Sequence, residues 1–398
     1  MRSNAHFLTC PLSRLPTCPP VHQLASRSSP LTMSRFLDPE VWAAVPMQFW
    51  SLVFFVFGCI VGSFLNVCIY RMPRGENIVT PPSHCPHCGY SIPWYLNVPL
   101  VTWLYLRGRC ANCRAPISVR YFLVELLTGV LFLLCWLNYH QTPWLALVYC
   151  LVIAGFIVAT FIDFEHFIIP DEITLGGVVV GFLGSFAFPA LHRKSSVMLS
   201  MKESFLGILV GAVVLYVILR LGKLMFGKQQ LLFPPDTRIV FTETKLQLPD
   251  KDIPYEELFY RKSDFVLLEA KQLELPDRCY KNATVRLTPD VLQIDEENIS
   301  PEEVTYMEIV TDKIVLPREA MGLGDVKFMA AIGAFLGWQA VLFSLMFSSV
   351  IGALVGVGLI LFKKQAWSSR IPYGPYIALA ATFWIFGGRR LLEWWLVR

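Results

Sequence analysis

The sequence predicts an all-α polytopic membrane protein of about eight transmembrane helices, with a zinc-knuckle cytoplasmic loop and a small β-rich soluble insertion. Three observations predict this fold. The 398 residues are 55% hydrophobic and only 16% charged, which leaves too little polar surface for a soluble domain of this size. Apolar runs of membrane-spanning length recur along the chain. Two Cys-x-x-Cys pairs follow the first run.

The N-terminal segment, residues 1–46, is rich in Pro, Ser and Arg and has no apolar core. We therefore expect a disordered arm rather than a signal peptide or a folded domain. The alternative is that translation begins at Met33 or Met47, so that these residues are not part of the protein. The first membrane helix is predicted within residues 47–70.

A helix needs roughly 17 to 25 mostly apolar residues to cross the hydrocarbon core of a bilayer. Residues 121–227 hold predicted spans two to five, and residues 321–398 hold spans six to eight. The sixth and eighth stretches are short, so we expect them to be tilted, extended or partly re-entrant. In order, the eight stretches are Phe49–Tyr70, Tyr121–Tyr139, Pro143–Ile162, Ile173–Leu191, Phe205–Leu221, Phe328–Trp338, Ala340–Phe362 and Tyr376–Phe386.

The orientation follows from the Lys and Arg residues of the short loops, which favour the cytoplasm. The loop at residues 71–120 carries one acidic residue, Glu76, and six arginines: Arg71, Arg74, Arg107, Arg109, Arg114 and Arg120. We place this loop in the cytoplasm, which puts Asp163 and Asp325 on the cytoplasmic face. The loop after span seven agrees through Lys363, Lys364 and Arg370. Five residues on the opposite side disagree: Arg193, Lys194, Arg389, Arg390 and Arg398.

The composition becomes polar and acidic over residues 228–320. Apolar and polar residues alternate over residues 238–248 and 283–294, which predicts strands of a small soluble domain. The net charge is +4, and most acidic residues lie in this insertion. The remainder is therefore strongly basic, which suits anionic membrane lipids better than nucleic acid.

The two cysteine pairs are Cys85-Pro-His-Cys88 and Cys110-Ala-Asn-Cys113. This spacing is typical of a four-cysteine zinc site, in which each pair forms a knuckle and two knuckles complete a tetrahedron. The alternative is two disulfides, which a reducing cytoplasm disfavours. With four thiolates and no open coordination position, the predicted zinc is structural.

Asp163 ends the third predicted span, where a carboxylate is costly to desolvate and is by default a functional candidate. Simpler interpretations exist: Asp163 marks the membrane interface, and Asp171, behind Pro170, caps the next helix.

A second acidic candidate lies in Met321-Gly-Leu-Gly324-Asp325-Val-Lys327, at the start of the sixth predicted span. Gly322 and Gly324 allow a backbone or an extended peptide to approach closely. A plain helix cap is the alternative here as well. If Asp163 and Asp325 face each other, they cannot both ionise easily, so one is an acid while the other is a base. Such a pair can activate water to attack a peptide bond.

At these residues the sequence resembles the prepilin peptidases, membrane aspartic proteases of the Gly-x-Gly-Asp type. The matching stretches are residues 62–73, the two cysteine pairs, Asp163 with Ile169-Pro170-Asp171, residues 322–327 and Ile371-Pro-Tyr-Gly-Pro375. The resemblance covers the chain from about Met47 to the C-terminus. The insertion and the long N-terminal arm depart from the usual family pattern.

The resemblance implies that Asp163 and Asp325 form the catalytic pair, in a multi-pass protein of the bacterial inner membrane. It implies type IV prepilins or type II secretion pseudopilins as substrates, cut after a glycine on the cytoplasmic side. It also implies methylation of the new N-terminus from S-adenosylmethionine, although no Gly-rich fingerprint for that cofactor is visible.

Two other classes of protein fit parts of the sequence. A proton- or cation-coupled transporter would also carry intramembrane carboxylates, but no internal repeat is evident. A pilin-binding assembly protein without catalysis would have no need for two costly carboxylates on one face.

Gly58-x-x-x-Gly62 and Gly352-x-x-x-Gly356 also allow neighbouring helices to approach closely, which we interpret as packing rather than binding. Glu125, in the second predicted span, is expected to pack or to pair with an arginine, and the alternative is that it lines the active cleft.

Overall fold

The fold was analysed in a computed structural model, which describes residues 42, 45–249, 252–259, 264–317, 321–362 and 372–396. The predicted disordered arm lies almost wholly outside these residues. Lys363, Lys364, Arg370 and Arg398, which entered the orientation argument, and Ile371 lie outside them as well.

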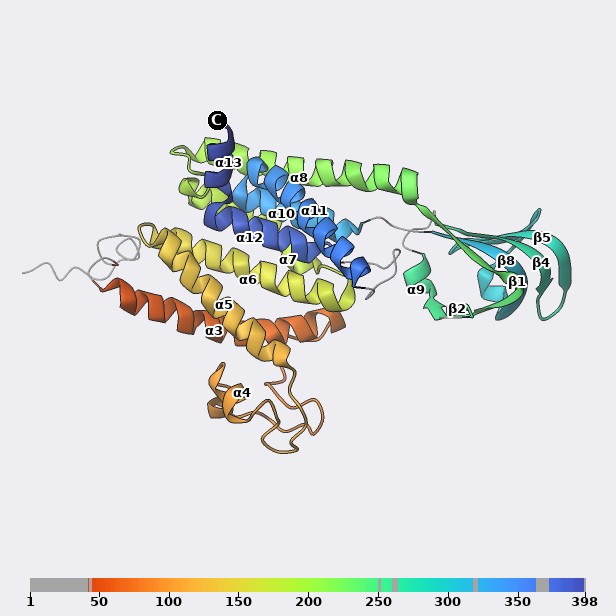
Figure 1. The fold of residues 1–398 in the computed structure, drawn as a ribbon, viewed down its shortest axis with the longest axis horizontal. Helices are drawn as coiled ribbons and strands as arrows, with labels where there is room; N and C mark the ends of the chain where they lie inside the picture. Colours follow the sequence, from red (N-terminus) through yellow and green to blue (C-terminus); the bar gives the residue numbers. More distant parts are fainter. Residues whose placement is uncertain are drawn as a thin grey trace, which may run out of the picture.

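The described residues are mostly helical, and five of their helices are long and apolar enough to cross a membrane. They lie side by side in a bundle, with the strands beyond one end of it (Figure 1). The prediction of a helical membrane protein is thus confirmed at this level. The five helices are α3 (Met47–Arg71), α5 (Val119–Tyr139), α6 (Pro143–His166), α8 (Val197–Phe226) and α11 (Trp338–Leu361).

The three other predicted spans also fall on helices, but these are shorter. They are α7 (Asp171–Ala187), α10 (Leu323–Leu336) and α12 (Gly374–Phe383), of 17, 14 and 10 residues. A π-helical turn (Trp384–Gly388) and α13 (Arg389–Leu396) follow α12. Helix α10 begins earlier than the predicted sixth span, and it ends where Gly337 adopts a φ of 81°.

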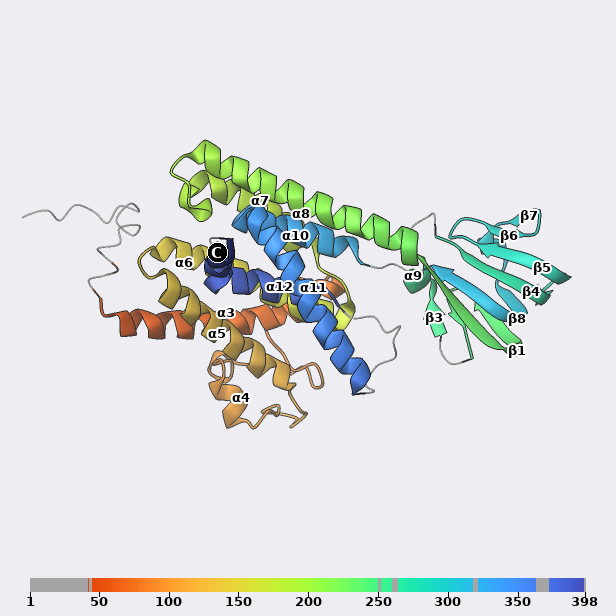
Figure 2. The same ribbon diagram turned by 45° about the horizontal axis from the view of Figure 1, so that its top comes forward.

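Helix α10 is the central helix and contacts α7, α8, α11 and α12. Figure 2 shows it beneath α8. Two glycines make this contact close: a Cβ on Gly207 of α8 would lie 2.1 Å from the carbonyl oxygen of Gly333, and one on Gly211 would lie 2.6 Å from that of Met329. The two backbones therefore touch, which is the way small residues pack membrane helices.

Helices α3 and α5 also approach each other through glycine, as the sequence predicts. A Cβ on Gly58 would lie 2.8 Å from the Cα of Gly129, and one on Gly62 would lie 2.8 Å from the Cα of Glu125. Glu125 is buried between the two helices, which agrees with packing, and among the described residues it has no arginine partner. Its carboxylate instead accepts a hydrogen bond of 2.8 Å from the backbone N–H of Leu100.

The predicted β-rich insertion is confirmed as one antiparallel eight-stranded sheet, in the order β3-β2-β1-β8-β4-β5-β6-β7. A short helix, α9 (Tyr255–Leu258), follows β3. The strands are β1 (Lys228–Thr242), β2 (Lys245–Gln247), β3 (Asp252–Pro254), β4 (Val266–Glu274), β5 (Cys279–Leu287), β6 (Leu292–Ile294), β7 (Glu297–Ile299) and β8 (Tyr306–Pro317).

The two segments predicted as strands are each parts of hairpins. Residues 238–248 contain the end of β1, a turn and β2, while residues 283–294 contain the end of β5, a turn and β6. The prediction of strands from the alternating side chains is confirmed, but the turn within each segment was not predicted. Their buried members, such as Ile239 and Val285, belong to one apolar core.

Strands β1 and β8, the first and last along the chain, pair with each other in the middle of the sheet, and Lys228 of β1 lies opposite Pro317 of β8. The chain thus leaves the bundle after α8 and returns toward α10 at nearly the same place. Insertions with adjacent ends disturb the host fold least. The buried carboxylate of Asp264 also binds Lys223 Nζ near the end of α8, at 2.7 Å.

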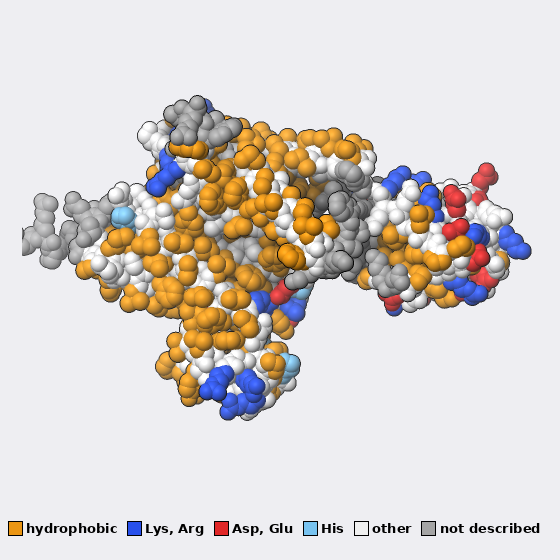
Figure 3. All heavy atoms as spheres, in the orientation of Figure 1, with side chains coloured by type: hydrophobic (Ala, Val, Ile, Leu, Met, Phe, Trp, Pro, Cys, Tyr) orange, Lys and Arg blue, Asp and Glu red, His pale blue; other side chains and the backbone are white. Residues whose placement is uncertain are grey.

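The surface shows the same division. Apolar side chains cover the bundle, while acidic and basic side chains gather on the sheet domain and basic ones on the loop around α4 (Val101–Tyr105) (Figure 3). A bundle with an apolar outer surface is suited to lipid rather than water.

The backbone contact of α8 with α10 makes a testable prediction. Gly207→Ala should lower the thermal stability of the detergent-solubilised protein, because the new methyl group overlaps a backbone carbonyl that cannot rotate away; overpacking of this kind costs about 1–3 kcal/mol. Gly176→Ala on α7 is the matched control, since nothing lies within 4 Å of that Cβ position. Equal unfolding temperatures for the two variants would contradict the close contact.

Candidate active site

Asp163 lies in the last turn of α6, which ends because Phe167 adopts a left-handed φ of 55° and donates its N–H to the carbonyl of Asp163. The Asp163 side chain is buried. Its Oδ2 accepts a hydrogen bond of 2.9 Å from the backbone N–H of Gly374, at the start of α12. A Cβ on Gly374 would lie 2.7 Å from that oxygen, so only glycine leaves room for the contact.

Asp325 lies in the first turn of α10, behind the extended N-cap residue Gly322, and is also buried. The Cβ position of Gly322 is 3.8 Å from Asp325 Oδ2. With no side chain at Gly322, the approach to this carboxylate stays open. Helix N-termini also favour negative charge, which offsets part of the cost of burying the carboxylate.

The structure brings these two carboxyl groups, far apart in sequence, to the same end of the bundle. Ile169 lies between their segments: it is 3.0 Å from the Cβ position of Gly374, beside Asp163, and 3.5 Å from that of Gly324, beside Asp325. The charge of Asp163 is close enough to act on the Asp325 carboxyl.

Asp171 and Lys327 form an ion pair at the same end of the helix bundle. Lys327 Nζ lies 2.7 and 3.0 Å from the two carboxylate oxygens of Asp171, joining the first turns of α7 and α10. The interpretation of Asp171 as a helix cap is wrong, because Pro170 occupies the N-cap position and Asp171 is the first helical residue. Both charged side chains are partly exposed, so the pair positions helices rather than completing the buried carboxylate site.

Two further contacts were not predicted. The N–H of Gly374 was missed because no side-chain pattern identifies a backbone donor; the only signal was the Pro-Tyr-Gly-Pro turn before a helix. Arg120, at the start of α5, forms an ion pair with Glu165, two residues after Asp163. This pair joins the first turn of α5 to the last turn of α6.

The four cysteines of the two pairs lie together. One ligand atom from each of them lies within 4.8 Å of all the others: Cys85, Cys88, Cys110 and Cys113. The described cysteines are free thiols, so the disulfide alternative has no support in the fold. Four such sulfur atoms match the donor set of a tetrahedral zinc site.

The two cysteine pairs adopt matching turns. Cys85 N donates to Tyr90 O and Gly89 N to Cys85 O, and in the same way Cys110 N donates to Ala115 O and Arg114 N to Cys110 O. Each turn places a residue at positive φ, Gly89 at 70° and Arg114 at 60°.

The turns also direct backbone N–H groups at the sulfur atoms. The backbone groups of Cys113 and Asn112 lower the pKa of the Cys110 thiol to about 6, while burial and the neighbouring thiols raise the pKa of Cys113 to about 11. A thiolate at neutral pH is the form that binds a metal. His84 and His87 are exposed and lie outside the four-cysteine cluster.

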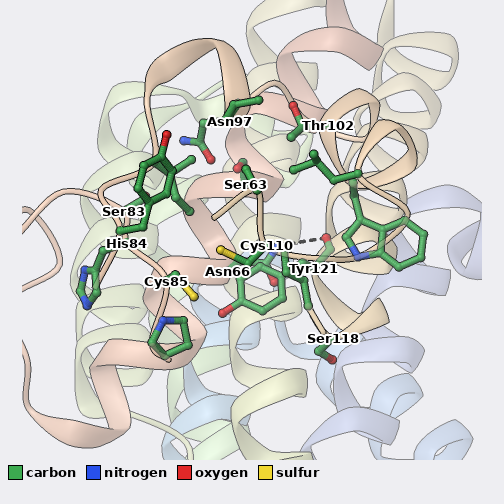
Figure 4. Close-up of a pocket in the computed structure, with 18 of the residues that line it drawn as sticks. Ser63, Asn66, Ser83, His84, Cys85, Asn97, Thr102, Cys110, Ser118 and Tyr121 are labelled. Atoms are coloured by element: carbon green, nitrogen blue, oxygen red, sulfur yellow. Dashed lines mark hydrogen bonds between the residues drawn. The ribbon is translucent and has the colours of Figure 1, made fainter. Parts of the chain in front are cut away.

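A cavity of about 370 Å³ lies between the cysteine loop, α3 and α5. In Figure 4, Ser63 and Asn66 line it from α3 and Tyr121 from α5, with Cys85 and Cys110 from the loop. The cavity is large enough for a small organic ligand.

Comparison with known proteins identifies the chain. Residues 56–139 match the model of the bacterial peptidase A24 N-terminal domain, and residues 150–231 and 304–357 match that of the type IV leader peptidase family. The second match is interrupted by most of the sheet domain. No solved structure matches.

Curated relatives agree with the family models. A protein of Dichelobacter nodosus named prepilin leader peptidase/N-methyltransferase is 35% identical over 207 residues, covering 44% of this chain and 69% of that protein. One of Aeromonas hydrophila with the same name is 29% identical over 385 residues, covering 90% and 97%. An Escherichia coli type 4 prepilin-like proteins leader peptide-processing enzyme is 36% identical over 192 residues, covering 44% and 68%. The chain therefore belongs to the type IV leader peptidase family.

Proposed function

We propose that this chain is a membrane aspartic endopeptidase that removes the leader peptide of type IV prepilins or type II secretion pseudopilins. The observation that carries the proposal is that two buried carboxyl groups, Asp163 and Asp325, lie at the same end of the bundle with Ile169 between their segments. Membership of the type IV leader peptidase family and the names of the relatives support the same reaction. They give no support to a proton- or cation-coupled transporter.

The chemistry follows from the proximity of the two carboxyl groups. One holds a proton while the other is charged, and the titration belongs to the pair. The charged carboxylate takes a proton from water as the oxygen attacks the peptide carbonyl, and the protonated carboxyl donates to the developing oxyanion. Collapse of the tetrahedral intermediate breaks the C–N bond, and the amine leaves with a proton. The N–H of Gly374 orients Asp163 for this step.

The supporting residues keep the approach open and hold the helices in place. Gly322 leaves space for an extended substrate backbone beside Asp325, while Gly324 allows the start of α10 to lie against Ile169. Pro170 starts α7, and the ion pair of Asp171 with Lys327 fixes α7 against α10. We assign these residues to positioning rather than to the chemical step.

For topology, we propose eight membrane helices in the bacterial inner membrane, with the carboxylate pair at the cytoplasmic face. Helices α7, α10 and α12 would be the short spans. The shortness of α10 is tolerated because other helices surround it. The organisation would be that of a first span, a zinc loop at residues 71–120, four further spans, the sheet domain and a C-terminal unit from residue 321. The charged loop and sheet domain fit an aqueous face.

For cofactors, we propose that the four cysteines hold a structural zinc ion. The two matching turns and the close grouping of the four sulfur atoms support this assignment. When bound, the metal cross-links the two halves of the loop. We also propose that the enzyme methylates the new N-terminus from S-adenosylmethionine, since the relatives carry the name N-methyltransferase.

The peptidase proposal predicts that Asp163→Asn and Asp325→Asn each reduce prepilin cleavage by about 10²–10⁴-fold or more, because an amide cannot take over proton transfer. The measurement is co-expression with a prepilin, scored by the mobility shift of the processed form. Asp236→Asn, an exposed change on the sheet domain, is the control and should cleave normally. Cleavage that survives both active-site changes would remove the assignment.

The zinc proposal predicts about one Zn²⁺ per purified chain. Cys85→Ser or a strong chelator should release the metal and lower the unfolding temperature, because metal binding is coupled to folding of the loop. Metal analysis and thermal unfolding measure the two effects. Cys279→Ser, at an exposed thiol of β5, should change neither. An unchanged unfolding temperature after complete removal of metal would count against a structural role.

The sheet domain is proposed to act in substrate choice. Because Lys228 and Pro317 are paired neighbours, a short Gly-Ser linker can replace the strands between them without moving α8 or α10. The shortened enzyme should still cleave, but its relative rates on different prepilins should change. Identical rates on every prepilin, measured against the full chain, would exclude this role.

A further inference from the structure

A cavity of about 140 Å³ lies at the end of the bundle away from the carboxylate pair. Its walls come from the end of α5, the start of α6, the turn between α7 and α8, the junction of α10 with α11, and the segment that leads into α13. In Figure 1 this end of the bundle lies opposite the sheet domain. We call it the basic cavity, because four of its charged side chains are positive and one is negative: Arg193, Lys194, Arg389, Arg390 and Glu203.

The positive side chains of this cavity oppose the usual distribution of charge in membrane proteins. In the proposed topology this end of the bundle faces away from the cytoplasm, where Lys and Arg are scarce in short loops. Two of the cations follow α7 and two lie near the C-terminus, so they are far apart in sequence, yet the structure gathers them around one cavity. Their repulsion is offset if the cavity holds an anion.

The positive charge is not cancelled by the protein itself. Lys194 Nζ lies 3.0 Å from Glu203 Oε1, so the carboxylate in the wall neutralises one cation. Arg193 and Arg390 take part in no ion pair among the described residues. Both charges are close enough to act on the hydroxyl of Tyr139, which also lines the cavity. Two guanidinium charges therefore lie beside the cavity without a carboxylate partner.

His192 adds a buried polar atom without a partner. Its side chain lines the cavity and is 8% exposed; Nδ1 lies 3.0 Å from Ser200 Oγ, while Nε2 has no hydrogen-bond partner. The backbone of Ala334 lies near the ring, but its carbonyl accepts from Ser204 Oγ at 2.9 Å. The ring carbon next to Nε2, Cδ2, lies 3.6 Å from the Cβ position of Gly337, so this edge of the ring faces the start of α11. Buried polar atoms are almost always paired, so Nε2 indicates a missing partner.

The missing partner is best matched by an oxygen anion. Burial lowers the pKa of His192 to about 4, so the ring is neutral near pH 7. When the hydroxyl of Ser200 donates to Nδ1, Nε2 carries the ring hydrogen and is a donor. The first N–H groups of α11, at Trp338 and Gln339, have no acceptor in their own helix, and Gly337 at the N-cap has no side chain to accept from them. Guanidinium groups and a helix N-terminus together favour a phosphate.

We infer that the basic cavity binds the phosphate group of an anionic membrane lipid. Arg193 and Arg390 would hold the phosphate oxygens by charge, while His192 Nε2 and the start of α11 would donate hydrogen bonds to them. The volume of about 140 Å³ suits a headgroup phosphate. A larger cofactor needs a site of roughly 300–1,000 Å³.

The surroundings of the cavity favour a lipid over free phosphate. Trp338 and Trp384 line it, and tryptophan is typical of the depth at which lipid headgroups lie. Phe383 and Leu391, which flank the lining segment in sequence, are exposed apolar side chains. In a bundle with an apolar outer surface, such side chains would contact the acyl chains of a lipid whose phosphate is in the cavity.

A lipid at this position would connect three parts of the fold. The cavity joins the turn between α7 and α8, the junction of α10 with α11, and α13. Helix α10 carries Asp325 in its first turn and ends at this cavity. Because the lipid binds only where these segments meet, it would stabilise the folded protein and the position of α10.

The experiment uses the full-length protein in a neutral detergent, after bound lipid has been removed. Phosphatidylglycerol, an anionic lipid, is added in steps; native mass spectrometry counts the lipids bound per chain, and the unfolding temperature is measured in parallel. We expect phosphatidylglycerol to bind and to raise the unfolding temperature. Phosphatidylethanolamine should bind at least about tenfold more weakly, because the cations repel its ammonium group. Equal binding of the two lipids would overturn the inference.

Charge variants locate the site. Arg193→Gln and Arg390→Gln each remove one positive charge and should weaken phosphatidylglycerol binding by about tenfold, as expected for the loss of one charge-assisted contact. Lys202→Gln is the matched control, because Lys202 is exposed near the same end of α8 but lines an apolar groove outside the basic cavity. An equal loss in all three variants would show a general attraction to surface charge and would overturn the inference.

Inorganic phosphate distinguishes a lipid site from a site for a free anion. At the concentration at which phosphatidylglycerol saturates the protein, inorganic phosphate alone should leave the unfolding temperature unchanged. An equal rise with phosphate, abolished by Arg193→Gln, would show a site for free phosphate and would overturn the assignment to lipid. The measurement involves no prepilin and no cleavage, so its outcome does not depend on the peptidase proposal.

Discussion

The proposed active site depends on the close contact between α8 and α10. Gly207 and Gly333 allow the two backbones to touch, and this contact holds α10 in the centre of the bundle. The N-terminus of α10 carries Asp325, so the position of the helix decides where that carboxylate lies. Any side chain in the contact would displace α10 as a rigid unit and change the spacing of Asp325 from Asp163.

Burying two acidic groups has an energetic cost that the fold offsets locally. Gly374 gives a backbone N–H to Asp163, and Asp325 lies at the positive end of a helix. Neither the backbone N–H of Gly374 nor the N-terminus of α10 brings a positively charged side chain to the carboxyl groups. A buried arginine or lysine would hold both carboxyl groups in the charged state and leave no acid in the pair. The charged residues nearby, Asp171 and Lys327, instead pair with each other at the surface.

The cysteine loop is connected to the bundle by few but specific contacts. Glu125 of α5 accepts from the backbone N–H of Leu100 in the loop, and Arg71 of α3 donates to the loop carbonyls of Asn77 and Pro81. The four cysteines lie together within the loop, and the cavity lies where the loop meets α3 and α5.

The sequence by itself determined the class of protein, the helical membrane segments, the β-rich insertion and the cysteine pairs, because these depend on local patterns. Hydrophobic length identifies a span, alternation identifies a strand, and Cys-x-x-Cys spacing identifies a knuckle. It also named Asp163 and Asp325 as candidates. Only the tertiary structure decided that they lie at the same end of the bundle, that Gly374 binds one of them, and that Glu125 binds Leu100 rather than an arginine. These are contacts between distant segments, in two cases through backbone atoms. Every residue except proline has a backbone N–H, so no residue pattern distinguishes the one that will bind.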